Sequence, residues 1–291
     1  MKKNRYKKKQ NISDLVFMTP GLLIYLIFMI IPIILTFYYS FTNWNGINAT
    51  YKFVGFKNFS YLLSDRSFIE AVKTTLIITV FTAFFLNVLA IIMAVILDGV
   101  GRVFKIGKVG IFIPAILSSV VVSFLWSYMT QTNGGIISYI LSMFNIPAFD
   151  FYKTTSRTTY LVAGVITWAA LGFYTTVYDA TLKTIPDELY EASRVDGANA
   201  LQKFFRITLP LLTPGITINS IMAVTWGLKQ YDFVKIMTPG SIQTIAVNAV
   251  ERAFDYNRFA YASAIVLVLF LAMVLISFLQ IYVTKKVEVE Y

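Results

Sequence analysis

Long stretches of apolar residues constrain the fold of this sequence more than any other feature. The clearest run from about Leu15 to Tyr39, from about Ala71 to Leu97 and from about Ala260 to Val283. A helix needs about 20 apolar residues to cross a bilayer. Apolar residues make up 57% of the chain and charged residues only 14%, against about 45–50% and about 25% in soluble domains. The composition therefore excludes an ordinary soluble domain and a disordered chain.

Three further stretches bring the predicted number of membrane-spanning helices to six. They lie at about 109–129, 160–182 and 211–228. The last two carry Thr, Trp, Gly and Asn, so their apolar character is weaker. The expected fold class is all-α, a polytopic membrane protein with six transmembrane helices.

Basic residues predict how these helices are oriented. Six of the first ten residues are Lys or Arg, and Lys285 and Lys286 follow the last span. Basic segments flank membrane helices on the cytoplasmic side. The first apolar stretch is longer than that of a cleavable signal, so we expect an uncleaved span. Both termini are predicted to be cytoplasmic, and the net charge of +10 needs no nucleic-acid partner.

The absence of two residue types restricts the chemistry. The chain has no Cys and no His, which removes thiol nucleophiles, Cys/His zinc sites and the commonest general base. It also has no G-x-x-x-x-G-K-[ST] phosphate loop. We therefore predict no catalytic residue and no metal site, and a polytopic membrane enzyme is disfavoured. The near absence of charge inside the spans also disfavours an ion-coupled secondary carrier.

One predicted cytoplasmic segment, 185–210, differs from the spans and reads as two short helices. Pro186 suits the first position of a helix, and the two acidic residues after it suit the positive end of the helix dipole. Gly197 is a natural stop. Asn199 and Gln202 form the spacing of a capping pair that opens the second helix.

This segment has two possible roles. The plain one is a solvated helix pair that joins two spans. The more specific role is a docking element for another protein. Small residues leave a surface that another protein can approach closely, and exposing large apolar side chains to water on an isolated loop is energetically unfavourable. The small residues are Ala192, Ser193 and Gly197, and the large ones are Tyr190, Phe204 and Phe205.

The spacing within this segment resembles a known motif. The residues that match it are Glu191-Ala192-Ser193, then Gly197, then Ile207-Thr208-Leu209-Pro210. The membrane subunits of binding-protein-dependent ABC importers share the form E-A-A-x3-G-x9-I-x-L-P, and only Ser193 departs from it. The longer context is similar to the carbohydrate branch, the maltose and glycerol-phosphate type permeases. The resemblance implies the type I ABC importer permease fold.

In this family the motif forms a coupling helix that contacts a cytoplasmic ATPase. The resemblance assigns that contact to Glu191, Ala192, Ser193, Asp196 and Gly197. An alternative is a local surface pair between Glu191 and Arg194. The implied partners are a second homologous permease in a heterodimer, two ATPase subunits that bind ATP and Mg, an extracellular sugar-binding protein and membrane lipid. The chain itself needs no cofactor, and the implied location is a prokaryotic plasma membrane.

The resemblance also implies a division of the chain. Residues 1–70 hold the cytoplasmic tail, the first span and the first extracellular loop. Residues 71–283 form the transmembrane domain, with the coupling loop at 183–210, and 284–291 form a cytoplasmic tail.

A substrate path through the third to fifth spans is implied in the same way. Its residues are Ser119, Phe173, Trp226, Gly227 and Gln230, together with the less polar Ile166, Ala169 and Ala170. Trp226 and Gln230 share a face if the helix continues to residue 230. Helix packing or an interfacial aromatic belt explains Trp226 and Phe173 equally well.

We expect no Lys or Arg in the middle of this path, which favours a neutral sugar, a mono- or oligosaccharide. A non-sugar solute such as glycerol phosphate, and a self-sufficient secondary carrier, remain the alternatives.

Overall fold

The computed structural model describes residues 17–98 and 102–284. Within these ranges the chain is built of helices, and the only β-pairing is an isolated bridge between Thr42 and Phe53. The basic N-terminal cluster, and Lys285 and Lys286, lie outside the described residues, so the orientation of the chain stays a prediction. The chain divides into two compact units, Met1–Ser64 with Ala249–Val268, and Asp65–Asn248 with Leu269–Tyr291.

Four unbroken helices are long and apolar enough to cross a membrane, in agreement with four of the predicted spans. They are Phe17–Ser40, Arg66–Ile96, Thr155–Leu182 and Phe259–Val283. Two further pairs of helices pass the same test but are bent, Ile106–Ile116 with Ser119–Met129 by 97° and Ala200–Leu211 with Thr213–Leu228 by 66°. The described residues therefore contain four spans, or six if each bent pair is one span. The all-α fold class is confirmed.

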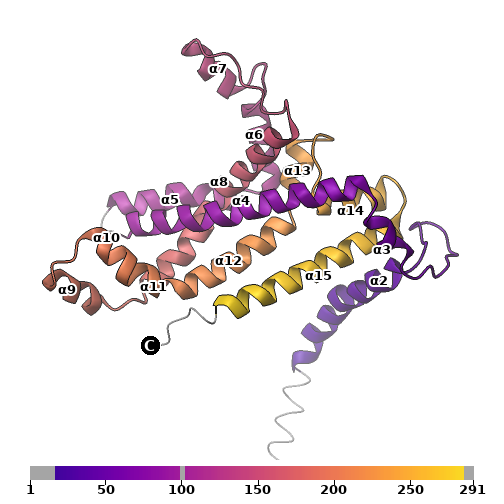
Figure 1. Ribbon diagram of the computed structural model, residues 1–291, viewed down its shortest axis with the longest axis horizontal. Helices are drawn as coiled ribbons and strands as arrows, with labels where there is room; N and C mark the ends of the chain where they lie inside the picture. Colours follow the sequence, from indigo (N-terminus) through magenta and orange to yellow (C-terminus); the bar gives the residue numbers. More distant parts are fainter. Residues whose placement is uncertain (1–16, 99–101, 285–291) are drawn as a thin grey trace, which may run out of the picture. The chain divides into compact units, whose positions relative to one another are not determined.

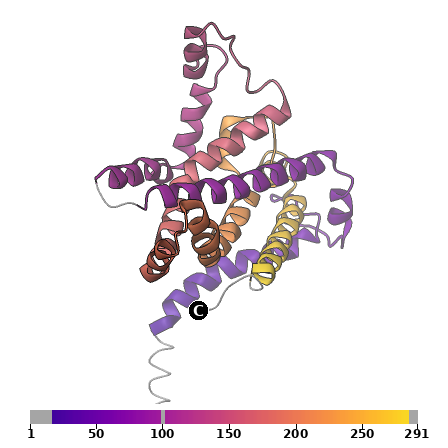
Figure 2. The same ribbon diagram turned by 60° about the vertical axis from the view of Figure 1, so that its left-hand side comes forward.

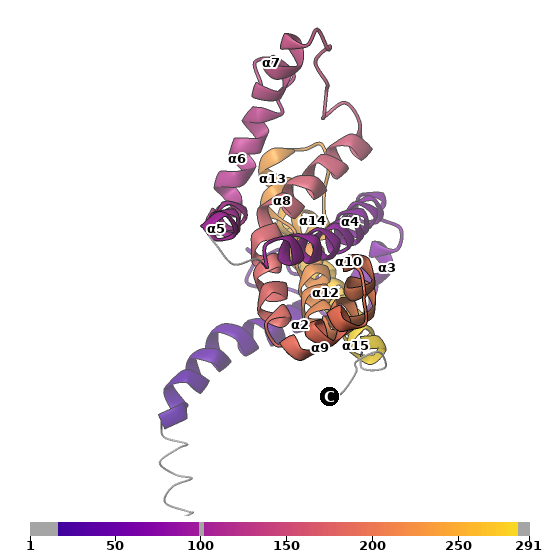
Figure 3. The same ribbon diagram turned by 90° about the vertical axis from the view of Figure 1, so that its left-hand side faces the viewer.

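The third predicted span, 109–129, was wrong as a single straight helix. It consists of α5 (Arg102–Ile116) and α6 (Ser119–Met129), and Figure 3 shows α6 and the following α7 (Ile136–Met143) turning away from α5. Pro114 lies inside α5 and has no N–H to donate. Ser118 has an extended backbone, and its hydroxyl accepts a hydrogen bond from the Val121 N–H at 3.3 Å. The proline weakens the first helix and the serine caps the start of a second.

The core of the second unit is a packed group of three helices, α4 (Arg66–Ile96), α8 (Thr155–Leu182) and α12 (Thr213–Leu228) (Figure 1). The largest fully buried side chains within this group belong to Ile78, Leu86, Val162, Ile166 and Tyr178. Buried threonines on α4 satisfy their hydroxyls locally, because each donates to the carbonyl four residues earlier. Thr75, Thr79 and Thr82 all do so at 2.7 Å. The helix can therefore bury polar residues without leaving unpaired groups in an apolar interior.

Shorter elements connect and cover these helices. They are α9 (Asp187–Val195), α10 (Ala200–Lys203), the π-helical η2 (Phe204–Thr208), α11 (Leu209–Leu211), α13 (Asp232–Met237) and α14 (Ile245–Phe254). The long helix α15 (Phe259–Thr284) follows α14. The segment from α9 to α11 lies beside the ends of α8 and α12 to which it is joined (Figure 2). The start of α14 is fixed to α4, since the Ile245 N–H donates to the Thr75 hydroxyl at 2.9 Å.

The first unit contains the helix Phe17–Ser40, which includes the π-helical turn η1 (Leu26–Ile30) and α2 (Ile31–Ser40), and the short α3 (Lys57–Leu62). An aromatic cluster organises its loop. The ring of Trp44 lies 4.3 Å from that of Tyr39 and 5.0 Å from that of Phe259. Such ring contacts stabilise a loop that has little other core.

Candidate functional site

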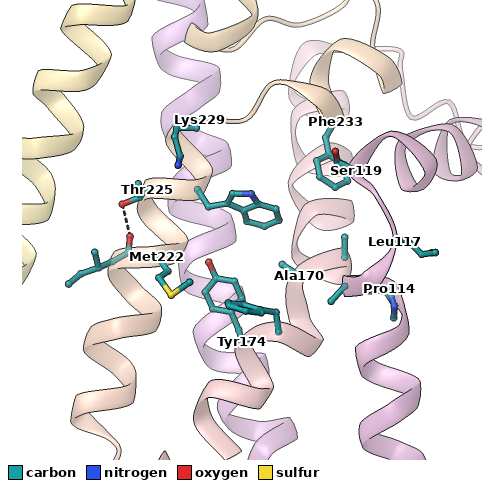
Figure 4. A pocket seen from close by; sticks show the side chains of 14 residues that line it. Pro114, Leu117, Ser119, Ala170, Tyr174, Met222, Thr225, Lys229 and Phe233 are labelled. Atoms are coloured by element: carbon teal, nitrogen blue, oxygen red, sulfur yellow. Dashed lines mark hydrogen bonds between the residues drawn. The ribbon is translucent and has the colours of Figure 1, made fainter. Parts of the chain in front are cut away.

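A cavity of about 480 Å³ opens between α8, α12 and the bend that separates α5 from α6 (Figure 4). One face of α12 lines it with Ile221, Met222, Thr225 and Trp226, and Lys229, which directly follows the helix, continues that wall. One face of α8 lines it with Ala169, Ala170, Phe173 and Tyr174. The bend and α13 complete the wall with Pro114, Ala115, Leu117, Ser119 and Phe233. Because the lining residues recur at i, i+1, i+4 and i+5 on both long helices, each helix presents a single face to the cavity.

The wall is mainly aromatic and aliphatic, with few polar groups. The Thr225 hydroxyl donates to the carbonyl of Ile221 in its own helix at 2.8 Å. The Ser119 hydroxyl donates to Oδ2 of Asp232 at 2.6 Å. Aromatic faces with a small number of polar groups are suited to a ligand that has apolar faces and a polar edge.

Three of the predicted path residues, Ser119, Phe173 and Trp226, line this cavity. Gly227 and Gln230 do not. A Cβ atom on Gly227 would lie 2.8 Å from Cα of Thr79, so this glycine serves the close contact of α12 with α4. Gln230 is 4% exposed, and its Nε2 donates to the Trp226 carbonyl at 3.2 Å. Gln230 was expected to share the face of Trp226 if the helix continued to residue 230, and this condition is not met, because α12 ends at Leu228.

The less polar residues implied by the resemblance divide in the same way. Ala169 and Ala170 line the cavity, whereas Ile166 is fully buried in the helix core. Sequence reasoning missed Tyr174 and Lys229. Tyr174 follows Ala170 by four residues and Lys229 follows Thr225 by four, so the helical period of the neighbouring lining residues could have indicated both.

The predicted stop after α9 is confirmed at Gly197. Its backbone has φ +73°, the left-handed conformation that glycine adopts without strain. The Ala198 N–H donates to the Ser193 carbonyl at 2.9 Å, and the Gly197 N–H donates to the Arg194 carbonyl at 3.2 Å. These two bonds form a Schellman motif, which satisfies carbonyls at the end of the helix.

The start of each short helix also follows the sequence. Pro186 precedes the first residue of α9, one position earlier than expected. Asn199 and Gln202 form the predicted capping box, since each side chain accepts a hydrogen bond from the backbone N–H of the other at 2.9 Å.

The exposed surface of α9 carries most of the predicted coupling residues. Glu191, Ala192, Asp196 and Gly197 are exposed. Ser193 is only 6% exposed and donates to the Tyr190 carbonyl at 2.8 Å, so it faces inward and is not available at that surface. Among the described residues Glu191 forms no salt bridge, which removes the local pair with Arg194.

Large apolar side chains near this surface divide between core and solvent. Tyr190 and Phe204 pack against the buried cluster of α4, α8 and α12. Val195 is 88% exposed, and Leu201 and Phe205 are also exposed. We call Glu191, Val195, Leu201 and Phe205 the α9–η2 surface. Exposed apolar groups beside a charged residue are typical of a site that another protein covers.

A charge cluster lies at the end of α8 that leads to this segment. Oδ1 of Asp179 accepts from Nζ of Lys108 on α5 at 2.6 Å, and Oδ2 accepts from Nζ of Lys183 at 2.7 Å. The hydrogen bond to Asp179 raises the pKa of Lys183. Burial, reinforced by the negative charge of Asp179, raises the pKa of Asp98. Within the described ranges no group of three His, Cys, Asp or Glu side chains could hold a metal ion.

Asp179→Asn is expected to lower the stability of the protein by about 1–2 kcal/mol. The Asp179 side chain is 14% exposed, and its loss leaves the Lys108 ammonium without a counter-charge between α5 and α8. Thermal unfolding in detergent measures this change. Lys183→Met is the control, because it removes only the exposed i,i+4 salt bridge between Lys183 and Asp179. A salt bridge of this kind contributes about 0.3–0.5 kcal/mol. Equal shifts for both variants would contradict the role of Asp179 as a link between helices.

Comparison with known proteins extends over nearly the whole chain. The family described as binding-protein-dependent transport system inner membrane component matches residues 9–289. The probable starch degradation products transport system permease protein AmyD of Thermoanaerobacterium thermosulfurigenes is 29% identical, over 97% of each chain. The multiple sugar-binding transport system permease protein MsmF of Streptococcus mutans is 30% identical, over 94% of this chain and 95% of its own.

A solved structure shares the fold. It is a bacterial alginate ABC transporter in complex with an alginate pentasaccharide-bound periplasmic protein, and a chain of it superimposes with a TM-score of 0.88 at 20% identity, over 97% of each chain. At this identity the likeness concerns the fold of the chain.

Proposed function

Since this chain belongs to the family of binding-protein-dependent transport system inner membrane components, we propose that it is one of two membrane-spanning subunits of an ATP-driven carbohydrate importer. The observation that carries this proposal is the cavity between α8, α12 and the α5–α6 bend, whose aromatic walls suit the apolar faces of a sugar ring. The names of the two relatives, which concern starch degradation products and multiple sugars, support the substrate class.

Coupling to ATP hydrolysis is the second part of the proposal. The α9–η2 surface docks on a cytoplasmic ATPase subunit, with Glu191 as its charged contact. A second homologous permease, two ATPases that bind ATP and Mg, and an extracellular sugar-binding protein complete the assembly. This chain catalyses no reaction itself. Both of its termini lie in the cytoplasm of a prokaryotic cell, on the same side as α9.

The coupling needs a structural link between the ATPase contact and the cavity. Tyr190 on α9 provides one, because its hydroxyl lies 3.1 Å from that of Thr208 and its ring packs against the core of α8 and α12. A displacement of α9 is thereby transmitted to the helices that line the cavity. These helices then move as rigid elements between two discrete arrangements.

Purification of the chain from its native cell in mild detergent, followed by reconstitution of the recovered complex in liposomes, tests the proposal. ATP-dependent uptake of a carbohydrate by a complex that contains an ATPase and a binding protein is the expected result. Uptake by the chain alone without ATP would overturn it in favour of a secondary carrier.

Trp226→Ala is expected to weaken carbohydrate binding by the complex by roughly tenfold, because its indole is the largest aromatic ring system among the lining residues. The dissociation constant of a labelled sugar measures this effect. Trp168→Ala is the control, since Trp168 packs against Trp126 and does not line the cavity. If Trp168→Ala weakened binding as much as Trp226→Ala, helix packing rather than sugar contact would explain Trp226.

A further inference from the structure

We propose that the cavity selects carbohydrates that carry a negatively charged group, a carboxylate or a phosphate, and that the ammonium of Lys229 binds this group. The inference rests on the proposed function, because it concerns the substrate of the same cavity. It differs from the neutral substrate that the sequence favoured, which rested on the expectation of no Lys or Arg in the middle of the path.

The position of Lys229 is the first argument. It directly follows the last residue of α12, Leu228, and continues the cavity-lining face that carries Thr225 and Trp226. Figure 4 shows the Lys229 side chain above that of Thr225, at the end of the cavity wall that α12 forms. Trp226 and Lys229 are three positions apart, which corresponds to a rise of roughly 4.5 Å along a helix. A sugar ring against Trp226 would therefore bring a carboxylate or phosphate on that ring within reach of Lys229.

The charge of the cavity is the second argument. Among the described residues that line the cavity, Lys229 is the only charged one. Among the described residues it forms no salt bridge. The acidic residue that follows it, Asp232, instead accepts the hydroxyl of Ser119. The described lining residues thus supply one positive charge, and the acidic group beside the wall, Asp232, is occupied by the Ser119 hydroxyl. The mainly apolar walls strengthen any interaction that an anion makes with Lys229.

A plainer explanation of Lys229 is its place at the carboxyl end of a helix. A lysine there interacts favourably with the helix dipole, and lysines at the ends of membrane helices reach toward water. Both roles are served by a lysine on any face of α12, so neither accounts for its place in the cavity wall. They also predict that loss of the charge affects stability without regard to the charge of the substrate.

The test uses the purified complex with its native partner subunits and measures equilibrium binding of three labelled probes. The probes are a uronic-acid trisaccharide, the same trisaccharide with its carboxyl groups reduced to alcohols, and a hexose phosphate. The variants are Lys229→Met, which removes the charge, and Lys229→Arg, which keeps it. Lys153→Met is the matched control, because Lys153 is exposed outside the cavity.

We expect the wild-type complex to bind an anionic probe at least about tenfold more tightly than the reduced trisaccharide, and Lys229→Met to weaken that binding by about 10- to 100-fold. Lys229→Arg and Lys153→Met should retain it, and the neutral probe should be unaffected by all three. The stronger of the two anionic probes identifies carboxylate or phosphate. Preferred binding of the neutral probe, or an equal loss for neutral and anionic probes in Lys229→Met, would overturn the role of Lys229.

The proposed function is tested separately by ATP-dependent uptake of the same probes. Uptake of the neutral trisaccharide alone would refute the inference and leave the proposed function standing. Absence of uptake for every carbohydrate would refute the proposed function and the inference with it.

Discussion

Gly197→Val is expected to reduce ATP-dependent import at least about tenfold while leaving ligand binding in the cavity intact. The backbone of Gly197 has φ +73°, a conformation that costs a β-branched residue at least about 1–2 kcal/mol. Space is not the obstacle, because no atom lies within 4 Å of a Cβ at this position. The cost therefore acts on the backbone alone, and the end of α9 is expected to rearrange and displace the exposed residues beside it.

Gly197→Asn is the control, since asparagine tolerates the left-handed conformation with little strain. Recovery of the ATPase subunit with the permease, together with the rate of sugar uptake, separates loss of docking from loss of folding. Glu191→Ala provides a second probe, because it keeps the helix end and removes one exposed charge of the α9–η2 surface. Full transport in both Gly197→Val and Glu191→Ala would refute the coupling role.

The features of α9 and α10 that the sequence predicted are local ones. The stop at Gly197 and the capping box of Asn199 with Gln202 each depend on residues within about one helical turn, so spacing is sufficient to identify them. The inward orientation of Ser193 was not predictable, because it depends on which face of α9 packs against the distant α8 and α12.

The same distinction explains the errors around the cavity. Gln230 leaves the face of Trp226 because α12 ends at Leu228, and no Gly or Pro follows that end between Lys229 and Met237. The Gln230 carbonyl instead accepts from the Thr244 hydroxyl at 2.6 Å, a contact made across fourteen residues. In contrast, the bend of the third span carries local signals, Pro114 followed by the capping residue Ser118, which the apolar length of 109–129 concealed.

The bend matters for function because it directly follows the part of α5 that packs against α8, where Gly172 permits a close approach. A Cβ atom at Gly172 would overlap the carbonyl oxygen of Ile111 and lie 2.6 Å from Cα of Phe112. Both atoms belong to the backbone of α5, which cannot move aside as a side chain does. Four of the residues that follow on α5 and the bend line the cavity: Pro114, Ala115, Leu117 and Ser119. The contact at Gly172 therefore fixes one wall of the cavity.

Gly172→Ala is accordingly expected to lower stability by about 1–3 kcal/mol and to weaken ligand binding, because α5 must shift away from α8. Gly164→Ala in the same helix is a matched control, since no atom lies within 4 Å of its Cβ. Alanine is the better helix former, so this variant is expected to gain up to about 1 kcal/mol. Thermal unfolding in detergent and the affinity for a labelled sugar measure both variants. Opposite shifts would establish that α5 sits on α8 through Gly172, whereas equal behaviour of the two alanines would show that this contact does not hold the cavity wall.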